Sequence, residues 1–564
     1  MVYEAKKIKA PVLRGAALKA YASAVRTPVL GDLLGSQMLG LAGVPELGNF
    51  VADDQLCSLR PRFFRPNEWQ PYQKDVRASL ETWPHAVGSS AGEFKYWSVR
   101  DYAQAYESGR KTPWDVAQAF LAAVKESESY QPPMRFFIAQ DENDLLRQAQ
   151  EATERWKAGA PKTLLDGVPI AVKDEVDMIP YPTSVGTSFM AQDAAKIDAI
   201  TVARLREAGA MLLGKANMHE LGMGVTGINP HHGAARNPYD PRRVTGGSSS
   251  GSAACVGAGI SPVALGADGG GSIRLPAAFC GVVGIKPTFG RIPEGGAAPL
   301  CWSVAHLGPI AATALDAWAG YVAMTGPIEG DEIALMQPPE QLNWPSNNGL
   351  EGKKIGIFRP WTNDTDDDVQ KIFVESLKKF EDCGAQLVDI EIEHLSLARV
   401  AHLTSIVSEM GASQMKHVKK HLHQYGVDIQ LNLKLIEGIS ASDYVQAQRV
   451  RDAMNTQLEN LFDKVDFIVT PATGCLPPMI HKNAESAGES DLGTLDRVMR
   501  FAPLANLTGH PAITFPVGYA EGNVPVAAQL IGSAWSEMGL LSAAHAFEQK
   551  LVRRAPHVYW DLLT

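Results

Sequence analysis

Closely spaced cysteines are missing from this sequence. Its 564 residues include six cysteines, and no two of them form a Cys-x-x-Cys pair. Structural zinc sites and disulfide frameworks in small domains need cysteines at short, regular spacings. The sequence therefore predicts neither a metal site nor disulfides and fits the reducing cytoplasm. The six lie at Cys57, Cys255, Cys280, Cys301, Cys383 and Cys475.

Long apolar runs are also missing. No window reaches the roughly 18 apolar residues of a membrane span, and no compact apolar core with a cleavage site follows Lys6, Lys7 and Lys9. We therefore expect a cytoplasmic protein with no integral membrane span and no secretory signal. The apolar, glycine-rich stretch 29–44 fits, in descending order, a buried helix, a dimer contact or a peripheral membrane contact, so a homodimer is an open alternative.

Positive charge is scarce as well. The chain has 52 Lys and Arg against 62 Asp and Glu, a net charge of −10. Such a balance argues against nucleic acid and anionic membranes as partners. The Gly-x-x-x-x-Gly-Lys-Ser/Thr phosphate loop does not occur, which leaves a nucleotide-binding module only as the non-enzymatic alternative. His231–His232 and the group His417, His421 and His423 raise a metal alternative, but a strongly basic context favours a solvated helix face for that group.

Two glycine- and serine-rich segments and one lysine stand out among the residues that are present. Gly246–Ser252 runs into the apolar, helix-like Ala253–Val256, which argues against a flexible linker. The second segment is Asp268–Pro276. Lys173 ends an apolar run, 168–172, that reads as a buried strand. Two serines and a lysine in this pattern predict nucleophilic catalysis of amide-bond cleavage through an acyl intermediate.

A serine hydroxyl becomes a strong nucleophile only when a neighbouring base takes its proton. A lysine acts as that base when it is neutral, a form that burial in an apolar setting favours. Asp174, Glu175 and Asp177 follow Lys173 directly and favour its charged form if they lie close to it. A lysine base therefore requires that the fold point these carboxylates away from Lys173.

The glycines before Ser272 suit the charge that develops in acyl transfer. Backbone N–H groups in a fixed turn stabilise an oxyanion. Gly269, Gly270 and Gly271 have no side chains to block a substrate's approach. The apolar segment 262–265 reads as a short strand, which places Ser272 at its exit into a loop.

Taken together, these segments resemble the amidase signature family of serine hydrolases, over roughly residues 96–564. The joint spacing of several motifs makes the resemblance specific. The segments that carry it are Gly214–Glu220, Gly247–Gly251, Asp268–Ala277, Gly284–Thr288, Asp466–Pro471 and Gly509–Ala512.

The resemblance implies a role for each site residue. Ser272 would be the nucleophile, Ser248 would follow a cis peptide bond and relay a proton, and Lys173 would be the general base. The supporting residues would be Ser249 and Asp268, which brace the site, Arg274, which is structural, and the N–H groups of Gly269, Gly270, Gly271 and Ser272, which form the oxyanion hole. No organic cofactor is implied.

The expected substrate is a small carboxamide, anilide or carbamate, with esterase activity as an accompaniment. Candidate substrate-binding residues are Gly222, Met223, Gly224 and Thr226; the glycines leave room and Met223 offers an adaptable apolar wall. This weakly favours an aryl or medium-length acyl group over acetamide. The resemblance gives membrane-bound members that act on fatty acid amides an N-terminal span, which we do not find here.

Two other enzymatic interpretations stay open. Some family members are the amidase subunit of a tRNA-dependent amidotransferase, although the extension formed by residues 1–95 is unusual for such subunits. Gly247–Gly251 also matches the Gly-x-Ser-x-Gly elbow of an α/β-hydrolase, with Ser249 as nucleophile and a histidine such as His510. The polar segment 240–245 before it is a poor match for the hydrophobic strand that such an elbow requires.

Alternating apolar and helical patterns predict an α/β sandwich around a mixed sheet. We expect residues 1–95 to form a partly helical extension, packed on the core or on a dimer partner, and residues 96–564 to form one catalytic domain with a largely helical segment at about 395–460. The predicted helices are 112–126, 141–157, 199–208 and 367–382, and the predicted strands include 211–213, 354–358 and 387–391.

Overall fold

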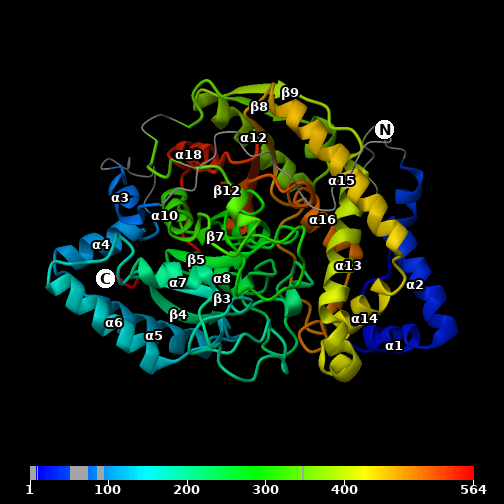
Figure 1. Cartoon of the computed structure of the whole chain (residues 1–564), viewed down its shortest axis with the longest axis horizontal. Helices are drawn as coiled ribbons and strands as arrows, with labels where there is room; N and C mark the ends of the chain where they lie inside the picture. Colours follow the sequence, from blue (N-terminus) through cyan, green and yellow to red (C-terminus); the bar gives the residue numbers. More distant parts are fainter. Residues whose placement is uncertain (1–7, 9, 51–73, 85–93, 340, 346–348) are drawn as a thin grey trace.

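The computed structural model describes residues 8, 10–50, 74–84, 94–339, 341–345 and 349–564. Cys57 and the lysines at 6, 7 and 9 lie outside these residues. Eleven strands form one mixed sheet flanked by helices, which confirms the predicted α/β sandwich (Figure 1). In sheet order the strands are β2 (Phe137–Ala139), β4 (Met211–Ala216), β3 (Pro169–Lys173), β5 (Val263–Ala267), β7 (Leu307–Ala311), β6 (Val283–Lys286), β12 (Ala512–Tyr519), β13 (Pro525–Gly532), β10 (Phe467–Pro471), β8 (Lys354–Ile357) and β9 (Gln386–Asp389).

Strands β3 and β5 are buried along their whole length and pair in parallel, with Ile170 opposite Val263 and Val172 opposite Leu265. Because parallel strands end at the same edge of a sheet, the register brings Lys173, the last residue of β3, beside the end of β5. The loop that leaves β5 carries the second glycine-rich segment. Lys173 is therefore a strand residue, as predicted, and the sheet brings it to that loop.

The helices around the sheet largely follow the sequence pattern. The predicted helices and strands all occur, with ends that differ by a few residues. Helix α5, for example, begins at a capping box in which Thr112 and Asp115 satisfy each other's backbone N–H groups. The flanking helices are α3 (Val76–Glu81), α4 (Val99–Glu107), α5 (Pro113–Ser129), α6 (Glu142–Lys157), α7 (Ile200–Glu207), α8 (Ser250–Gly257), α9 (Arg274–Phe279), α10 (Ala314–Met324), α11 (Arg359–Thr362), α12 (Asp367–Asp382), α16 (Leu492–Met499), α17 (Pro503–Thr508) and α18 (Glu537–Glu548).

The segment expected to be helical at about 395–460 consists of α13 (Leu395–His421), α14 (Val427–Ile436) and α15 (Ala441–Phe462). Helices α13 and α15 lie side by side along one flank of the molecule (Figure 1). Helix α13 also packs against α17, and both contact the loop that follows β5. This segment therefore forms one wall of the site.

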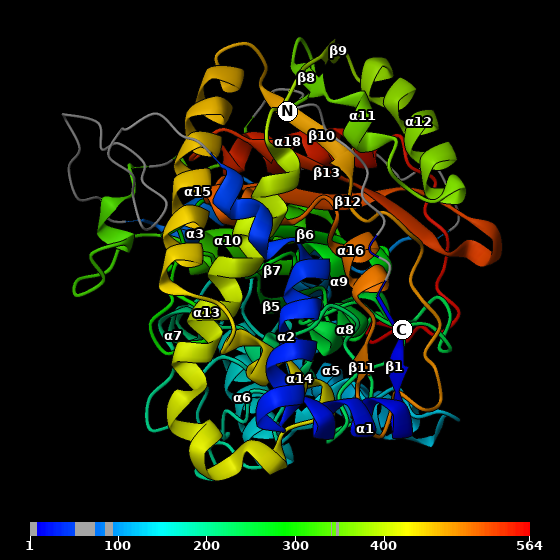
Figure 2. The same ribbon diagram turned by 90° about the vertical axis from the view of Figure 1, so that its right-hand side faces the viewer.

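In the described N-terminal extension α3 packs on α10, whereas the part over residues 10–50 packs on the segment formed by α13, α14 and α15 of the same chain (Figure 2). The latter part consists of α1 (Gly15–Val25), α2 (Pro28–Ala42) and the short η1 (Val44–Asn49), and its strand β1 (Leu13–Arg14) pairs with β11 (Glu489–Ser490). Leu18, Ala22 and Val25 of α1 cluster with Leu431 of α14.

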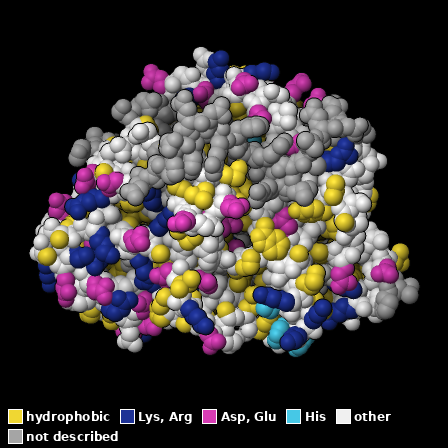
Figure 3. All heavy atoms as spheres, viewed as in Figure 1, with side chains coloured by type: hydrophobic (Ala, Val, Ile, Leu, Met, Phe, Trp, Pro, Cys, Tyr) yellow, Lys and Arg dark blue, Asp and Glu magenta, His cyan; other side chains and the backbone are white. Residues whose placement is uncertain are grey.

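The first expectation for stretch 29–44, a buried helix, is wrong. Leu30 is 44% exposed and Leu33 is 66% exposed, while Met38 and Ala42 are buried. Helix α2 thus buries one face only. Within the described residues no helix combines the length and apolar character needed to cross a membrane. On the face seen in Figure 3, side chains of both charge signs are interspersed with apolar ones.

Candidate active site

Lys173 and Ser248 form the centre of the candidate site. Lys173 Nζ donates to Ser248 Oγ at 2.8 Å, and both side chains are buried. A second hydrogen bond runs from Nζ to the carbonyl oxygen of Ala267 at 3.3 Å, at the end of β5. The peptide bond between Gly247 and Ser248 is cis, as the resemblance implies. Strand β3 and the segment that precedes α8 thus bring together a lysine and a serine that are 75 positions apart in the sequence.

Ser272 lies in the loop between β5 and α9, as predicted. It is 7% exposed, against 2% for Ser248 and 0% for Lys173, so it is the most accessible of the three. The Ser249 N–H donates to the Ser272 carbonyl oxygen at 3.3 Å, which joins the two serine segments. No hydrogen bond between Ser272 Oγ and Ser248 Oγ occurs in the part of the chain that the structure describes. Catalytic hydrogen bonds are often long without substrate and tighten in the complex.

The acidic residues after Lys173 do not all point away from it. Asp174 accepts hydrogen bonds from Ser184 Oγ at 2.5 Å and the Gly186 N–H at 3.0 Å, and lies 3.3 Å from Lys215 Nζ. Glu175, however, places Oε2 2.7 Å from Lys173 Nζ. The requirement for outward-pointing carboxylates is met by Asp174 and not by Glu175, because the turn after β3 folds Glu175 back over the lysine.

The glycine loop before Ser272 offers fewer free donors than the sequence suggested. Gly271 N–H donates to Asp268 Oδ1 at 2.6 Å, so it is already engaged. Within the described residues, the N–H groups of Gly269, Gly270 and Ser272 donate to no protein acceptor. Of the four N–H groups expected to form the oxyanion hole, that of Gly271 is thus engaged by Asp268, and those of Gly269, Gly270 and Ser272 are the available donors.

Asp268 and Arg274 hold this loop in place. Arg274 pairs with both oxygens of Asp268 at 3.0 and 3.1 Å, and Asn506 of α17 donates to the same carboxylate at 2.9 Å. Burial disfavours the charged form of Asp268, but Arg274 outweighs it and holds the pKa of that carboxyl well below its usual range. Arg274 is itself fully buried and donates to Gln529 Oε1 at 2.5 Å. The pair is a fixed, charged brace beneath the loop.

His402 of α13 is a site residue that the sequence did not reveal. Its Nε2 lies 2.7 Å from the carbonyl oxygen of Gly269, which can only accept, so Nε2 carries the proton. Burial lowers the pKa of His402 to about 4, so the ring is neutral at pH 7. A peptide's C=O and N–H point in opposite directions, so fixing this carbonyl also fixes the N–H of Gly270. A Cβ on Gly270 would lie 2.8 Å from His402 Cε1, which explains the glycine.

Ser249 does not have the environment of a nucleophile. Its hydroxyl donates to the Ala267 carbonyl oxygen at 3.2 Å and accepts from the Ala267 N–H at 3.3 Å, and the residue is fully buried. Among the described residues no histidine hydrogen-bonds to it. His510 instead packs its ring on Phe462 at 5.4 Å. These contacts argue against the α/β-hydrolase interpretation and fit Ser249 as a brace between α8 and β5.

The four candidate substrate-binding residues lie on the segment that follows β4, within and after the short helix η2 (Glu220–Gly222). Gly222 has φ +64°, and a Cβ there would lie 3.3 Å from Ser248 Oγ and 3.5 Å from Leu300 Cδ1. Gly224 is closely covered by the ring of His219. Thr226 is half-buried, and its hydroxyl accepts from the Ile228 N–H at 3.4 Å. Gly222 is thus the one of the four that borders the serine–lysine pair directly.

Met223 belongs to an apolar cluster beside the site. Ile406 of α13 reaches the other side of the site, since a Cβ on Gly269 would lie 3.1 Å from its Cδ1. We define the apolar wall as five residues of this cluster: Leu221, Met223, Leu300, Ile406 and Met410. An apolar surface therefore extends from Gly222 to the glycine loop.

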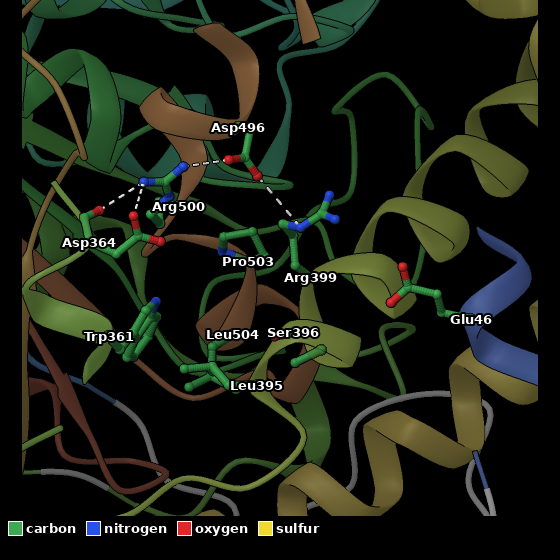
Figure 4. A pocket seen from close by; sticks show the side chains of 11 residues that line it. Glu46, Trp361, Asp364, Leu395, Ser396, Arg399, Asp496, Arg500, Pro503 and Leu504 are labelled. Atoms are coloured by element: carbon green, nitrogen blue, oxygen red, sulfur yellow. Dashed lines mark hydrogen bonds and ion pairs between the residues drawn. The ribbon is translucent and has the colours of Figure 1, made fainter. Parts of the chain in front are cut away.

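A separate small pocket lies between α13, α16 and α17 (Figure 4). Its polar lining is paired: Arg500 lies 2.6 Å from both Asp364 and Asp496, and Arg399 lies 3.6 Å from Asp496. None of the residues predicted for the site lines it. This pocket is therefore not the candidate active site.

Comparison with known proteins finds amidases and related amide-acting proteins. The Amidase family model matches residues 118–541. A fatty acid amide hydrolase from Arabidopsis thaliana is 34% identical over all of this chain and 96% of its own length. An amidotransferase subunit for glutamyl-tRNA(Gln) from Coxiella burnetii (strain Dugway 5J108-111) is 32% identical over 77% of this chain and 93% of its own. The solved structure of peptide amidase from Stenotrophomonas maltophilia superposes with a TM-score of 0.70 at 27% identity, covering 82% of this chain and 98% of its own.

Proposed function

Because this chain belongs to the amidase signature family and is an amidase acting on C–N bonds other than peptide bonds, we propose that it hydrolyses amides of long-chain carboxylic acids through an acyl-enzyme on Ser272. The observation that carries the mechanism is the 2.8 Å contact between Lys173 Nζ and Ser248 Oγ. That contact places the buried Lys173 against Ser248. The next residue, Ser249, donates its N–H to the carbonyl oxygen of Ser272.

In this mechanism Ser272 Oγ attacks the amide carbonyl carbon while its proton passes to Ser248, whose own proton passes to a neutral Lys173. The N–H groups of Gly269, Gly270 and Ser272 stabilise the oxyanion. The proton on Lys173 then returns through Ser248 to the leaving nitrogen, and the C–N bond breaks. Water, activated by the same relay, hydrolyses the ester and releases the acid, which restores Ser272.

The apolar wall and the relatives both support a long acyl chain in the substrate. Leu300 borders Gly222, and Ile406 borders the glycine loop, so apolar atoms line both sides of the site. Each buried methylene of a substrate contributes about 0.8 kcal/mol. The sequence weakly favoured an aryl or medium-length acyl group; the relatives named fatty acid amide hydrolases, which match over the whole chain, favour a longer one. Their match includes the extension, so the lack of a predicted N-terminal span does not separate this chain from them.

A series of primary amides from acetyl through octanoyl and dodecanoyl to hexadecanoyl tests the acyl class. We expect kcat/KM to rise at least about tenfold between the acetyl and dodecanoyl amides, because added methylenes are buried in the transition state. The measurement uses the purified chain alone, with ammonia release as readout. Equal rates along the series would contradict a long-chain substrate, and activity that appears only with glutamine and a partner protein would favour the amidotransferase interpretation.

The position of His402 makes a prediction about the oxyanion hole. His402→Ala is expected to lower kcat about tenfold or more with little change in KM, because the donors of the hole act on the transition state. His402→Gln should recover part of the loss, since an amide N–H can donate to Gly269 O. The matched control is Ser405→Ala, on the next turn of α13, which should leave kcat nearly unchanged. A raised KM with normal kcat in His402→Ala would show instead a role in substrate binding.

A further inference from the structure

The proposed base has three acceptors around its nitrogen, and one of them is charged. Lys173 Nζ lies 2.8 Å from Ser248 Oγ, 3.3 Å from the Ala267 carbonyl oxygen and 2.7 Å from Glu175 Oε2. The side chains of Lys173 and Glu175 are only 1% and 11% exposed, so solvent screens the pair weakly. The mechanism proposed above gives Glu175 no role.

We propose that Glu175 is a positioning residue for Lys173: it orients the amine toward Ser248, and its negative charge opposes loss of the lysine's proton. This inference rests on the proposed function, in which Lys173 takes the proton of Ser248. It concerns the pair of Lys173 and Glu175 and does not depend on the length of the substrate's acyl chain.

The geometry of an amine limits how Lys173 can take a proton from Ser248. A protonated lysine has three N–H donors. Here Nζ donates to Ser248 Oγ and to the Ala267 carbonyl oxygen, and the Glu175 carboxylate adds an ion pair. A neutral lysine keeps two hydrogens and one lone pair. With Nζ hydrogen-bonded to the Ala267 carbonyl oxygen and paired with the Glu175 carboxylate, the lone pair faces Ser248 Oγ, which is the direction from which the proton arrives. Without Glu175, the amine is free to rotate its lone pair away from Ser248.

The charge of Glu175 has a second consequence. A carboxylate at this distance favours the charged lysine, so it opposes formation of the base. The wild-type enzyme therefore gains orientation at the cost of activity at lower pH. Removing the charge while keeping an acceptor separates the two effects.

The other titratable groups near the pair do not replace Glu175. Burial, followed by the charge of Glu175, raises the pKa of Glu294 to about 8, so Glu294 is mostly protonated at neutral pH. Burial, with the charge of Lys173, lowers the pKa of His219 to about 4, so its ring is neutral. Burial also raises the pKa of the Cys301 thiol, which stays protonated.

Glu409 of α13 is the remaining carboxylate on this side, and it is occupied elsewhere. It accepts from the N–H groups of Trp302 and Ser303 at 2.6 and 2.9 Å and from Tyr444 at 3.0 Å. Arg451 lies close enough to be influenced by its charge. Among the residues that the structure describes, Glu175 is thus the carboxylate that forms an ion pair with Lys173.

The experiment compares Glu175→Gln with the wild type over a range of pH. The readouts are kcat/KM for an amide and the second-order rate constant for inactivation by a fluorophosphonate, which reports activation of the serine without an acyl substrate. We expect the lower limb of both profiles to move down by about one pH unit or more. The high-pH plateau should stay within about threefold of wild type, because glutamine still accepts a hydrogen bond.

The matched control is Asp177→Asn, which removes the same charge two residues further along the chain; the charge of Asp177 acts on Lys215. Its profile should coincide with that of the wild type. Glu175→Ala, which loses the acceptor as well, should show the same downward shift together with a plateau at least about tenfold lower. If Glu175→Gln does not fold, Glu175→Asp should give a smaller shift in the same direction.

Unshifted or upward-shifted limbs in the folded Glu175 variants would overturn the inference. Failure of the proposed substrate has a different signature, in which fluorophosphonate inactivation proceeds with the expected shift but long-chain amides are not hydrolysed. A wild-type enzyme that resists the fluorophosphonate altogether would remove the serine nucleophile, and this inference with it.

Discussion

Ser272→Ala is expected to abolish amide hydrolysis, with kcat falling on the order of 10³-fold or more, because it removes the hydroxyl that forms the proposed acyl-enzyme. Ser272 is the most accessible of the three proposed triad residues and follows directly on the glycine loop. The measurement is product release from an acyl amide that the wild type hydrolyses. Mass spectrometry after fluorophosphonate treatment should in addition find the adduct on Ser272 in the wild type and none in the variant.

Ser249→Ala is the control that separates Ser272 from the other interpretation of the Gly/Ser run. Loss of the two hydrogen bonds to Ala267 should lower stability by about 1–3 kcal/mol, and the folded variant should retain most of its activity. Activity that survives in Ser272→Ala and disappears in Ser249→Ala would refute the assignment of the nucleophile.

Lys173→Ala is expected to lower kcat about 10²- to 10⁴-fold, the range for loss of a general base. Below the plateau, wild-type activity should rise with pH as the lysine loses its proton, whereas the residual activity of the variant should lack this dependence. Lys173 is fully buried, so melting curves are needed to show that the variant is folded. Ser248→Ala should give a loss of similar size, because the two residues act as one relay.

A wild-type profile that stays flat from neutral to alkaline pH, with chemistry limiting the rate, would count against Lys173 as the base. So would a Lys173→Ala variant with the activity of the wild type. Neither result depends on the acyl group chosen, provided that the wild type hydrolyses it.

Local sequence was sufficient where local interactions decide the structure. The helices at 141–157 and 367–382 appear as α6 and α12, because apolar residues at helical spacing must face a core. The apolar run before Lys173 appears as strand β3, because a short continuous apolar run suits a strand that is buried on both faces. The prediction of a buried helix at 29–44 was wrong, because apolar content does not show which faces of a helix are buried. Helix α2 is buried only where it packs on its neighbours, α14 among them.

The site shows a similar division. The residue types and spacing of Lys173, Ser248 and Ser272 pointed to amide cleavage through an acyl-enzyme. Lys173 ends an apolar strand, and both serines lie in glycine-rich segments. Gly271 was included in the oxyanion hole because glycines in sequence look alike. Only the fold shows that its N–H is taken by Asp268.

By itself the sequence determined the family resemblance, the α/β class, and the serines and lysine on which the proposed chemistry rests, because these depend on residue type and short-range pattern. Tertiary structure alone decided what surrounds them. His402 reaches Gly269 from a helix more than a hundred residues away, and Glu175 turns back onto Lys173 while Asp174 beside it turns to Lys215. Such contacts follow from how elements pack and from the direction of each side chain in a turn, and neither is written in the order of residues along the chain.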